Sequence, residues 1–185
     1  MSKPKQEIPE SITIRKPNLD DGESLYFLVA SCPPLEINSV YSYLLVCSHF
    51  NRTSAVCEFK DDIVGFVSGY IHPHQSDTLF IWQIAVRDHM RGRGIAQEML
   101  LNILKRKELG NINYLETTVT SDNSSSRSLF NSLARQLGAP VTEDSYFTKE
   151  VFQESRHPEE FIIRIGPFNQ ETDSLKLLNE YKEGR

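Results

Sequence analysis

The most informative part of the sequence is Trp82-Gln83-Ile84-Ala85-Val86, followed after residues 87–90 by Arg91-Gly92-Arg93-Gly94-Ile95-Ala96. An apolar β-forming run leads into a glycine-rich turn, and the turn leads into an amphipathic helix. Gly92 and Gly94 let a ligand approach the backbone because they carry no Cβ. The free N–H groups of a helix N-terminus attract an anion, and Arg91 and Arg93 add donors for phosphate. The stretch therefore predicts a cradle for a pyrophosphate group.

Other phosphate-binding loops fit this turn less well. A Walker A loop requires Gly-Lys-Ser or Gly-Lys-Thr after its glycines, and that sequence is missing here. The dinucleotide fingerprint Gly-x-Gly-x-x-Gly requires a third glycine at the position of Gln97. A surface turn with solvated arginines is the remaining alternative, and the strand before it and the helix after it disfavour that reading.

Length and composition limit the class of protein. The chain has 185 residues, a length typical of one domain, and 39% of them are hydrophobic, enough for a sizeable core. The net charge of −5 at pH 7 disfavours nucleic-acid binding, which needs a basic surface. Three irregularly spaced cysteines do not make a disulfide framework. No apolar run has the length of a membrane span, and residues 1–10 lack a signal-peptide core, so we expect a soluble cytoplasmic protein.

The remaining pattern predicts a mixed α/β or α+β chain. We expect strands over residues 12–14, 55–59, 63–72, 78–86, 114–120 and 161–165, with a hairpin turn at Lys60-Asp61-Asp62. We expect helices near residues 20–31, after the cap Asn38-Ser39, from Ile95, and after the cap Asp122-Asn123. A flexible tail over 1–11, one domain over 12–168 and a polar extension over 169–185 complete the expected organisation.

The pattern Arg-x-x-Gly-x-Ala from Arg91 to Ala96 resembles the acetyl-CoA loop of the GNAT acetyltransferases. Asn123 and the helix after it are similar to the GNAT turn and helix that contact the pantetheine arm. The resemblance implies a mixed central sheet with helices on both faces, in which the parallel strands 78–86 and 114–120 splay apart and admit acetyl-CoA. It implies cofactor contacts at Ile84, Ala85, Val86, Arg91, Gly92, Arg93, Gly94, Ile95, Ala96, Asn123, Ser126 and Phe130.

Four further stretches resemble one branch of this family, the L-2,4-diaminobutyrate acetyltransferases of ectoine synthesis. They are residues 33–41, 80–86, 115–123 and 161–168, and the sequences Pro-Pro-Leu and Leu-Glu-Thr-Thr are the most specific. The resemblance implies transfer of acetyl from acetyl-CoA to the γ-amine of diaminobutyrate by direct attack in a ternary complex. It also implies a homodimer. We expect no metal. Glu36 stands where this branch usually has Asp, so the reach of that carboxylate differs by one methylene.

Two residues are expected to contact the reacting amine. An amine as basic as lysine is mostly protonated at neutral pH and must lose a proton before it attacks. Glu116 is the first candidate to bind the ammonium and relay its proton. The alternative for Glu116 is an ion pair across the sheet with a surface Lys. Trp82, the single tryptophan, is expected to be a pocket wall that contacts a cation through its π-face, and a place in the core is its alternative.

Other side chains are expected to hold the α groups of the substrate. Glu36 is the candidate for the α-ammonium, and neutral hydrogen bonds are expected from Asn38, Ser39, Tyr41 and Thr118. Helix capping is the alternative for Asn38 and Ser39. His157 resembles a family position near the substrate, with an exposed loop histidine as the alternative.

Phe130 stands where many GNAT enzymes have a tyrosine, so we expect a wall at that place and not an acid. His72-Pro73-His74 offers too few ligands for a metal site. Two other functions stay open: a GNAT enzyme for another small amine, and a non-catalytic module that binds acyl-CoA.

Overall fold

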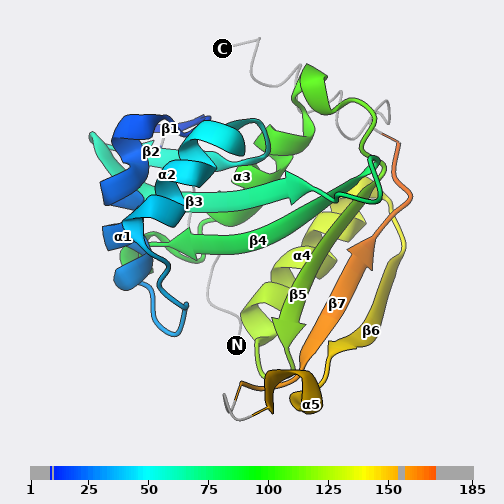
Figure 1. Cartoon of the computed structure of the whole chain (residues 1–185). Helices are drawn as coiled ribbons and strands as arrows, with labels where there is room; N and C mark the ends of the chain where they lie inside the picture. The colour runs from blue at the N-terminus through cyan, green and yellow to red at the C-terminus, as the bar shows by residue number, and fades with distance from the viewer. Residues whose placement is uncertain (1–8, 10, 154–156, 170–185) are drawn as a thin grey trace, which may run out of the picture. The chain divides into compact units, whose positions relative to one another are not determined.

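The computed structural model describes residues 9, 11–153 and 157–169 (Figure 1). The expected tail and the expected C-terminal extension therefore lie almost wholly outside the described residues. Seven strands form a mixed sheet in the order β1-β2-β3-β4-β5-β7-β6. The strands are β1 (Ile12–Arg15), β2 (Ala55–Phe59), β3 (Asp62–Ile71), β4 (Thr78–Val86), β5 (Tyr114–Thr120), β6 (Val141–Phe147) and β7 (Glu160–Ile165). The helices are α1 (Gly22–Ala30), α2 (Val40–His49), α3 (Ile95–Leu104), α4 (Ser124–Leu137) and α5 (Lys149–Phe152).

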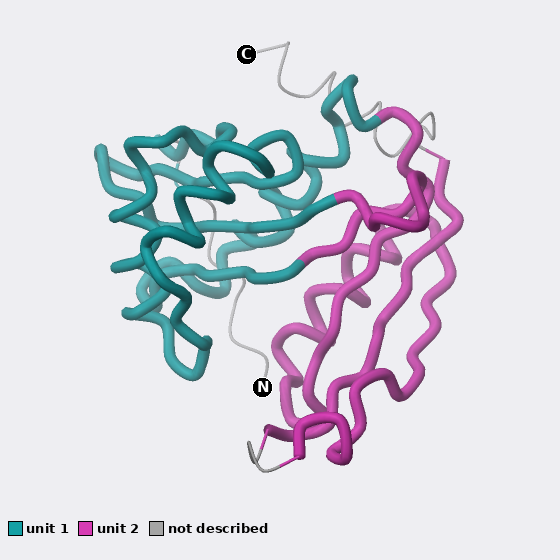
Figure 2. The backbone as a smooth tube through the Cα atoms, viewed as in Figure 1, with its two compact units in different colours: residues 1–70, 82–109 teal, residues 71–81, 110–185 magenta. Residues whose placement is uncertain are grey.

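The chain divides into two compact units (Figure 2), and it passes from one to the other at residues 70/71 in β3, at 81/82 in β4 and at 109/110. Unit 1 holds residues 1–70 and 82–109, and unit 2 holds residues 71–81 and 110–185. β4 and β5 pair in parallel over Thr78–Ile81 and Tyr114–Thr117, within unit 2. Four strand pairs are antiparallel: β1–β2, β2–β3, β5–β7 and β6–β7. The expectation of a mixed sheet is confirmed.

Unit 1 is layered, with helices on both faces of its strands (Figure 1). On one face, the buried side chains of α1 and α2 form a core with those of β2 and β3, including Leu25, Leu28, Val46, Val56 and Phe66. On the other face, α3 packs against β2. A Cβ built at Gly65 would lie 3.0 Å from Met99 Cε, so the absence of a side chain there lets α3 approach closely.

Local signals in the sequence set the ends of these elements. Lys60 and Asp61 have φ values of 51° and 67°, which gives the left-handed two-residue turn of a β-hairpin. The side chain of Ser39 caps α2 by accepting from Ser42 N–H, and that of Asn123 caps α4 by accepting from Ser126 N–H. These expected turns and caps are confirmed.

Unit 2 packs α4 on one face of β5 and β7 (Figure 1). Leu115 and Val119 on β5, and Ile163 and Ile165 on β7, alternate with more polar residues and are buried. The register places Leu115 opposite Ile165, so the buried side chains of both strands share one face. Glu116 and Thr118 alternate with this set and lie on the opposite face of β5.

The expected order of elements was wrong between residues 140 and 160, where the structure contains β6 and α5. All residues of β6 are exposed, and β6 is an edge strand that pairs with β7. An edge strand that buries neither face does not need alternating apolar residues. Its polar sequence Val141-Thr142-Glu143-Asp144-Ser145 therefore gave no strand pattern.

Candidate functional site

The glycine turn lies in unit 1 between β4 and α3, as expected. Gly92 and Gly94 have φ values of 76° and 85°, a region that favours glycine. Gly94 is the N-cap residue of α3, and no side chain caps this helix end. A Cβ built at Gly92 would meet nothing within 4 Å. The first-turn N–H groups of α3 are thus offered to an anion beside an open stretch of backbone, which fits a pyrophosphate group.

Arg91 fastens this turn to the end of β4. Its Nε donates to the carbonyl oxygen of Val86 at 2.9 Å, and its Nη1 donates to Asp88 Oδ1 at 3.3 Å. The exposed guanidinium therefore already has a structural role besides its expected one toward phosphate. Arg93, Ala96 and the flanking strand residues Ile84 and Val86 are half-buried, while Ala85 and Ile95 are buried.

A chain of hydrogen bonds joins residues 33–41 to β4 within unit 1. The Tyr43 hydroxyl donates to Gln83 Oε1 at 3.3 Å, and Gln83 Nε2 donates to the carbonyl oxygen of Glu36 at 2.9 Å. The backbone N–H of Asn38 donates to the Tyr43 hydroxyl at 3.4 Å. Sequence reasoning missed both Tyr43 and Gln83. The signal for Gln83 was a lone amide inside an otherwise apolar strand.

The candidate residues near the start of α2 and in β4 have different structural roles. Ser39 caps α2, so capping holds for it, whereas Asn38 contributes a backbone donor. Tyr41 is exposed. Trp82 is 52% exposed, so the alternative that placed it in the core is wrong. An indole with an open face suits contact with a cation.

Glu116 lies in unit 2 and is almost fully buried beside Arg164. The two residues are opposite each other in the β5–β7 register, and Arg164 Nη1 donates to Glu116 Oε1. The same nitrogen donates to Gln75 Oε1 at 2.9 Å, and the guanidinium lies 3.9 Å from the centre of the Tyr114 ring. The expected alternative, an ion pair across the sheet, is therefore realised, with an arginine in place of a lysine. Thr118 is the next residue on the same face and is half-buried.

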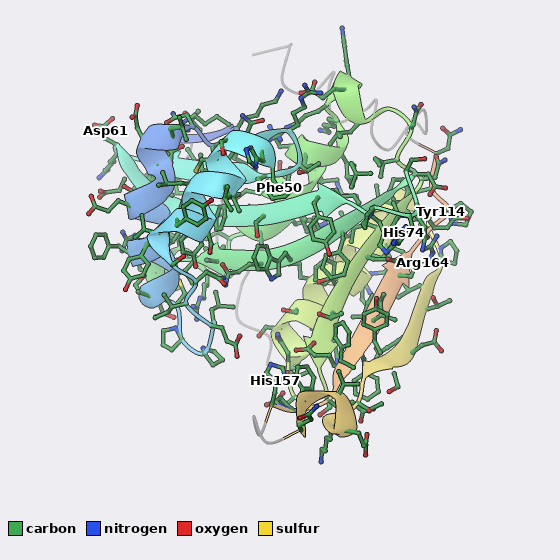
Figure 3. The ribbon with its side chains drawn as sticks, viewed as in Figure 1. Phe50, Asp61, His74, Tyr114, His157 and Arg164 are labelled. Atoms are coloured by element: carbon green, nitrogen blue, oxygen red, sulfur yellow. The ribbon has the colours of Figure 1, made fainter. Side chains whose placement is uncertain are left out.

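His157 is held by three contacts and is not a freely exposed loop residue. Its ring stacks on Phe152, with centroids 4.2 Å apart and planes at 26°. Its Nδ1 lies 2.7 Å from the carbonyl oxygen of Pro158, so the tautomer with a proton on Nδ1 forms a hydrogen bond. Its Nε2 lies 3.8 Å from Glu160 Oε1. Figure 3 labels His157 in the segment before β7.

The start of α4 holds the remaining cofactor candidates, also in unit 2. Asn123 Oδ1 accepts from the Ser126 N–H at 3.0 Å and so fixes the turn. Ser126 is half-buried. Phe130 is buried and packs inside the unit, which suits an apolar wall. The structure thus brings Glu116, Thr118 and Arg164 together on one sheet face, and residues 36–41 together with β4 through Gln83.

Other reactive groups are poorly placed for chemistry. All three cysteines are buried, and burial raises the pKa of Cys47 and Cys57 to about 11. A thiol with so high a pKa is a weak nucleophile at neutral pH. Over the described residues, no three His, Cys, Asp or Glu side chains gather as metal ligands. None of the described helices has both the length and the apolar character to cross a membrane.

Comparisons with known proteins identify the family. The model of the acetyltransferase (GNAT) family matches residues 22–134. L-2,4-diaminobutyric acid acetyltransferase of Bordetella parapertussis is 44% identical over 84% of this chain and 84% of its own length. The enzyme of the same name from Halomonas elongata is 43% identical over 88% of this chain and 83% of its own length.

Solved structures agree. Diaminobutyrate acetyltransferase EctA from Paenibacillus lautus, in complex with its substrate L-2,4-diaminobutyric acid and coenzyme A, is 34% identical. Its TM-score is 0.82, over 87% of this chain and 98% of that one. The ribosomal-protein-S18-alanine N-acetyltransferase from Escherichia coli, with a TM-score of 0.63 over 88% of this chain and 97% of that one, is 17% identical and shares the fold. This chain therefore belongs to the GNAT family of acetyltransferases and, within it, to the L-2,4-diaminobutyric acid acetyltransferases.

Proposed function

We propose that this chain transfers the acetyl group of acetyl-CoA to the γ-amine of L-2,4-diaminobutyrate. The product is N4-acetyl-L-2,4-diaminobutyrate, in a step of ectoine biosynthesis. The observation that carries the proposal is the similarity to the Paenibacillus lautus enzyme, which was solved with diaminobutyric acid and coenzyme A. Acetyl-CoA supplies the thioester carbonyl that the amine attacks. The weak nucleophilicity of the buried thiols favours direct attack over an acetyl-cysteine intermediate.

The cofactor roles are assigned to the glycine turn and to the start of α4. The uncapped first turn of α3, after Gly92 and Gly94, suits the pyrophosphate. We assign the pantetheine amides to the backbone of β4 at residues 84–86, beyond the last described β4–β5 pair, Ile81 and Thr117, where a ligand can pair as a peptide adds to a strand. Asn123, Ser126 and Phe130 are the further contacts that we propose.

We assign the ammonium groups of the substrate to two carboxylates and an aromatic ring, and its remaining contacts to neutral or weakly basic side chains. Glu116 is proposed to bind the γ-ammonium and accept its proton, directly or through water. Trp82 is proposed to cover the cation with its exposed ring. Glu36 is proposed for the α-ammonium, and the set that completes the contacts is Asn38, Ser39, Tyr41, Thr118 and His157.

The experiment follows free thiol from acetyl-CoA with diaminobutyrate, ornithine, lysine and putrescine, and assigns the acetylated nitrogen by NMR. We expect thiol release with diaminobutyrate and acetyl on the γ-nitrogen. Thiol release with several amines contradicts the assignment of diaminobutyrate as the substrate. Binding of CoA without thiol release identifies a non-catalytic module. Glu116→Gln should lower kcat strongly, by about 100-fold, if the carboxylate accepts the proton.

We also propose that two copies of this chain associate and that the protein works in the cytoplasm, where acetyl-CoA is supplied. The exposed edge strand β6 and the side chains of Tyr146 and Phe147 are candidate contacts for a second copy. Light scattering coupled to size-exclusion chromatography measures the mass directly. A monomer mass at micromolar concentration contradicts this assembly.

A further inference from the structure

Two ion pairs of equal exposure differ in how fully their hydrogen bonds are satisfied. The Arg15 and Asp21 side chains in unit 1 are 30% and 7% exposed, and those of Arg164 and Glu116 in unit 2 are 29% and 7% exposed. Arg15 donates through Nε, Nη1 and Nη2, to both oxygens of Asp21, to Glu58 and to a backbone carbonyl. Arg164 donates through Nη1 to Glu116 and Gln75. The second pair therefore uses far less of its hydrogen-bonding capacity.

The unused groups lie on both partners. Within the described part of the chain, no residue accepts from Nε or Nη2 of Arg164, and none donates to Oε2 of Glu116. A guanidinium has five donors, and a carboxylate oxygen has two lone pairs. Leaving a nearly buried charged group with a single partner is costly. The pair thus presents free N–H donors of Arg164 next to a free carboxylate oxygen of Glu116. A ligand that carries both a carboxylate and an ammonium group could bind to both.

The guanidinium is also fixed in orientation. It lies 3.9 Å from the centre of the Tyr114 ring, and Figure 3 labels both residues. Gln75 and Glu116 accept hydrogen bonds from its Nη1. Because the guanidinium is stacked on a ring and held at Nη1, the edge formed by its Nε and Nη2 N–H groups has a fixed direction. That edge suits a carboxylate, which accepts two parallel hydrogen bonds. The arrangement is preorganised before any ligand arrives.

We infer that Arg164 binds the α-carboxylate of the amino-acid substrate, while Glu116 Oε2 accepts from an ammonium group of the same molecule. The inference rests on the proposed function and deepens it, because it names the group that distinguishes an amino acid from a plain diamine. A diamine leaves the free edge of Arg164 without an anion and so forfeits this contact. Glu116 then has two roles at once, since Oε1 holds Arg164 and Oε2 faces the substrate.

The test compares diaminobutyrate with 1,3-diaminopropane, which has the same two amines and lacks the carboxylate. In Arg164→Gln, we expect kcat/KM for diaminobutyrate to fall about 100-fold, chiefly through KM. The value for diaminopropane should fall by about tenfold at most, because diaminopropane makes no contact with Arg164 and is affected only through Glu116, which loses the cation beside its Oε1. If diaminopropane is bound without turnover, its inhibition constant against diaminobutyrate takes the place of kcat/KM.

Two further variants keep the outcome decisive. Arg164→Lys keeps the positive charge beside Glu116 and loses the bidentate edge. We therefore expect kcat/KM for diaminobutyrate to fall about tenfold and kcat/KM for diaminopropane to stay unchanged. It serves as the test if Arg164→Gln does not fold. Arg15→Gln breaks the matched pair in unit 1, and any effect should be equal for both amines. An equal loss for both amines in the Arg164 variants overturns the inference and leaves the proposed function intact. A wild-type protein that releases no thiol with diaminobutyrate overturns the proposed function instead.

Discussion

Tyr43 donates a hydrogen bond to Gln83 at 3.3 Å, although the two residues are 40 positions apart. The bond joins α2 to β4, and Gln83 passes the connection on to the carbonyl oxygen of Glu36. Neither side chain belongs to the proposed substrate contacts. Both nevertheless hold in place the segment that carries Glu36 and Asn38, so they are positioning residues for that segment.

Replacing Tyr43 by phenylalanine removes this link and keeps the buried ring. We expect the free energy of unfolding to fall by about 1 kcal/mol, the usual net value of one hydrogen bond. The KM for diaminobutyrate should rise more than kcat falls, because the loop of Glu36 is less firmly held. Urea denaturation and steady-state kinetics measure both. Tyr41→Phe, at an exposed position, is the control for stability and should leave the free energy of unfolding unchanged. An unchanged stability of Tyr43→Phe contradicts the structural role of the bond.

Arg106 anchors the segment before β2 through three backbone carbonyls. Its Nη1 donates to the oxygens of Asn51, Arg52 and Ser54, at 3.1, 2.7 and 2.7 Å. Burial lowers the pKa of Arg106 to about 10, so the side chain remains protonated at neutral pH. Arg106→Met leaves these acceptors without their donor and should cost about 2 kcal/mol of stability. Chemical denaturation measures the loss, and Lys107→Met at the neighbouring exposed position should cost nothing measurable. Equal stabilities of the two variants contradict the anchoring role.

Asp21 should make stability depend on pH in the acid range. Burial raises its pKa, but the hydrogen bonds from Arg15 and from the backbone N–H of Asn18 outweigh burial, so the net pKa is lowered. An unfolded aspartate titrates at about pH 4. The unfolded state therefore binds more protons below that pH, and the stabilisation is complete above about pH 5 and is lost as the pH falls through the folded pKa.

Urea denaturation at several values between about pH 7 and pH 3 measures this dependence. Asp21→Asn should be less stable at neutral pH and should lose less stability on acidification than the wild type. The comparison isolates Asp21 because the other carboxylates titrate in both proteins. Parallel curves for the two proteins contradict a lowered pKa of Asp21.

The cysteines should be unreactive in the native protein. Cys32, Cys47 and Cys57 are buried, and the pKa of the last two is raised to about 11 by burial. A chromogenic disulfide reagent at about pH 8 should therefore label no thiol within minutes, and should label all three in urea. Single Cys→Ala variants that fold should retain kcat, as direct attack on acetyl-CoA requires. A fast-reacting thiol whose loss abolishes turnover contradicts direct attack.

Local patterns predicted the elements to which we assign the cofactor. The bounds of β4 and β5 agree with the expected strands, and α3 begins at Ile95 as expected, because these segments bury one face and end at polar or glycine residues. β6 was missed because an exposed edge strand has no buried face to reveal it. The caps at Ser39 and Asn123 were found since a cap acts within three residues of itself.

The candidate site likewise has parts that local sequence predicts and parts that it does not. Local sequence was enough to predict the glycine turn and the helix after it, and residues 33–41 and 115–123 were the most specific sign of the family. The tertiary structure was needed to show that Glu116 pairs with Arg164, which is 48 positions away, and that Gln83 donates to the backbone of Glu36. Such contacts depend on strand order and register, and a shift of one residue turns every side chain to the other face of the sheet. The periodicity of a short segment does not indicate which strand pairs with it. The pairing is set by the packing of the whole chain.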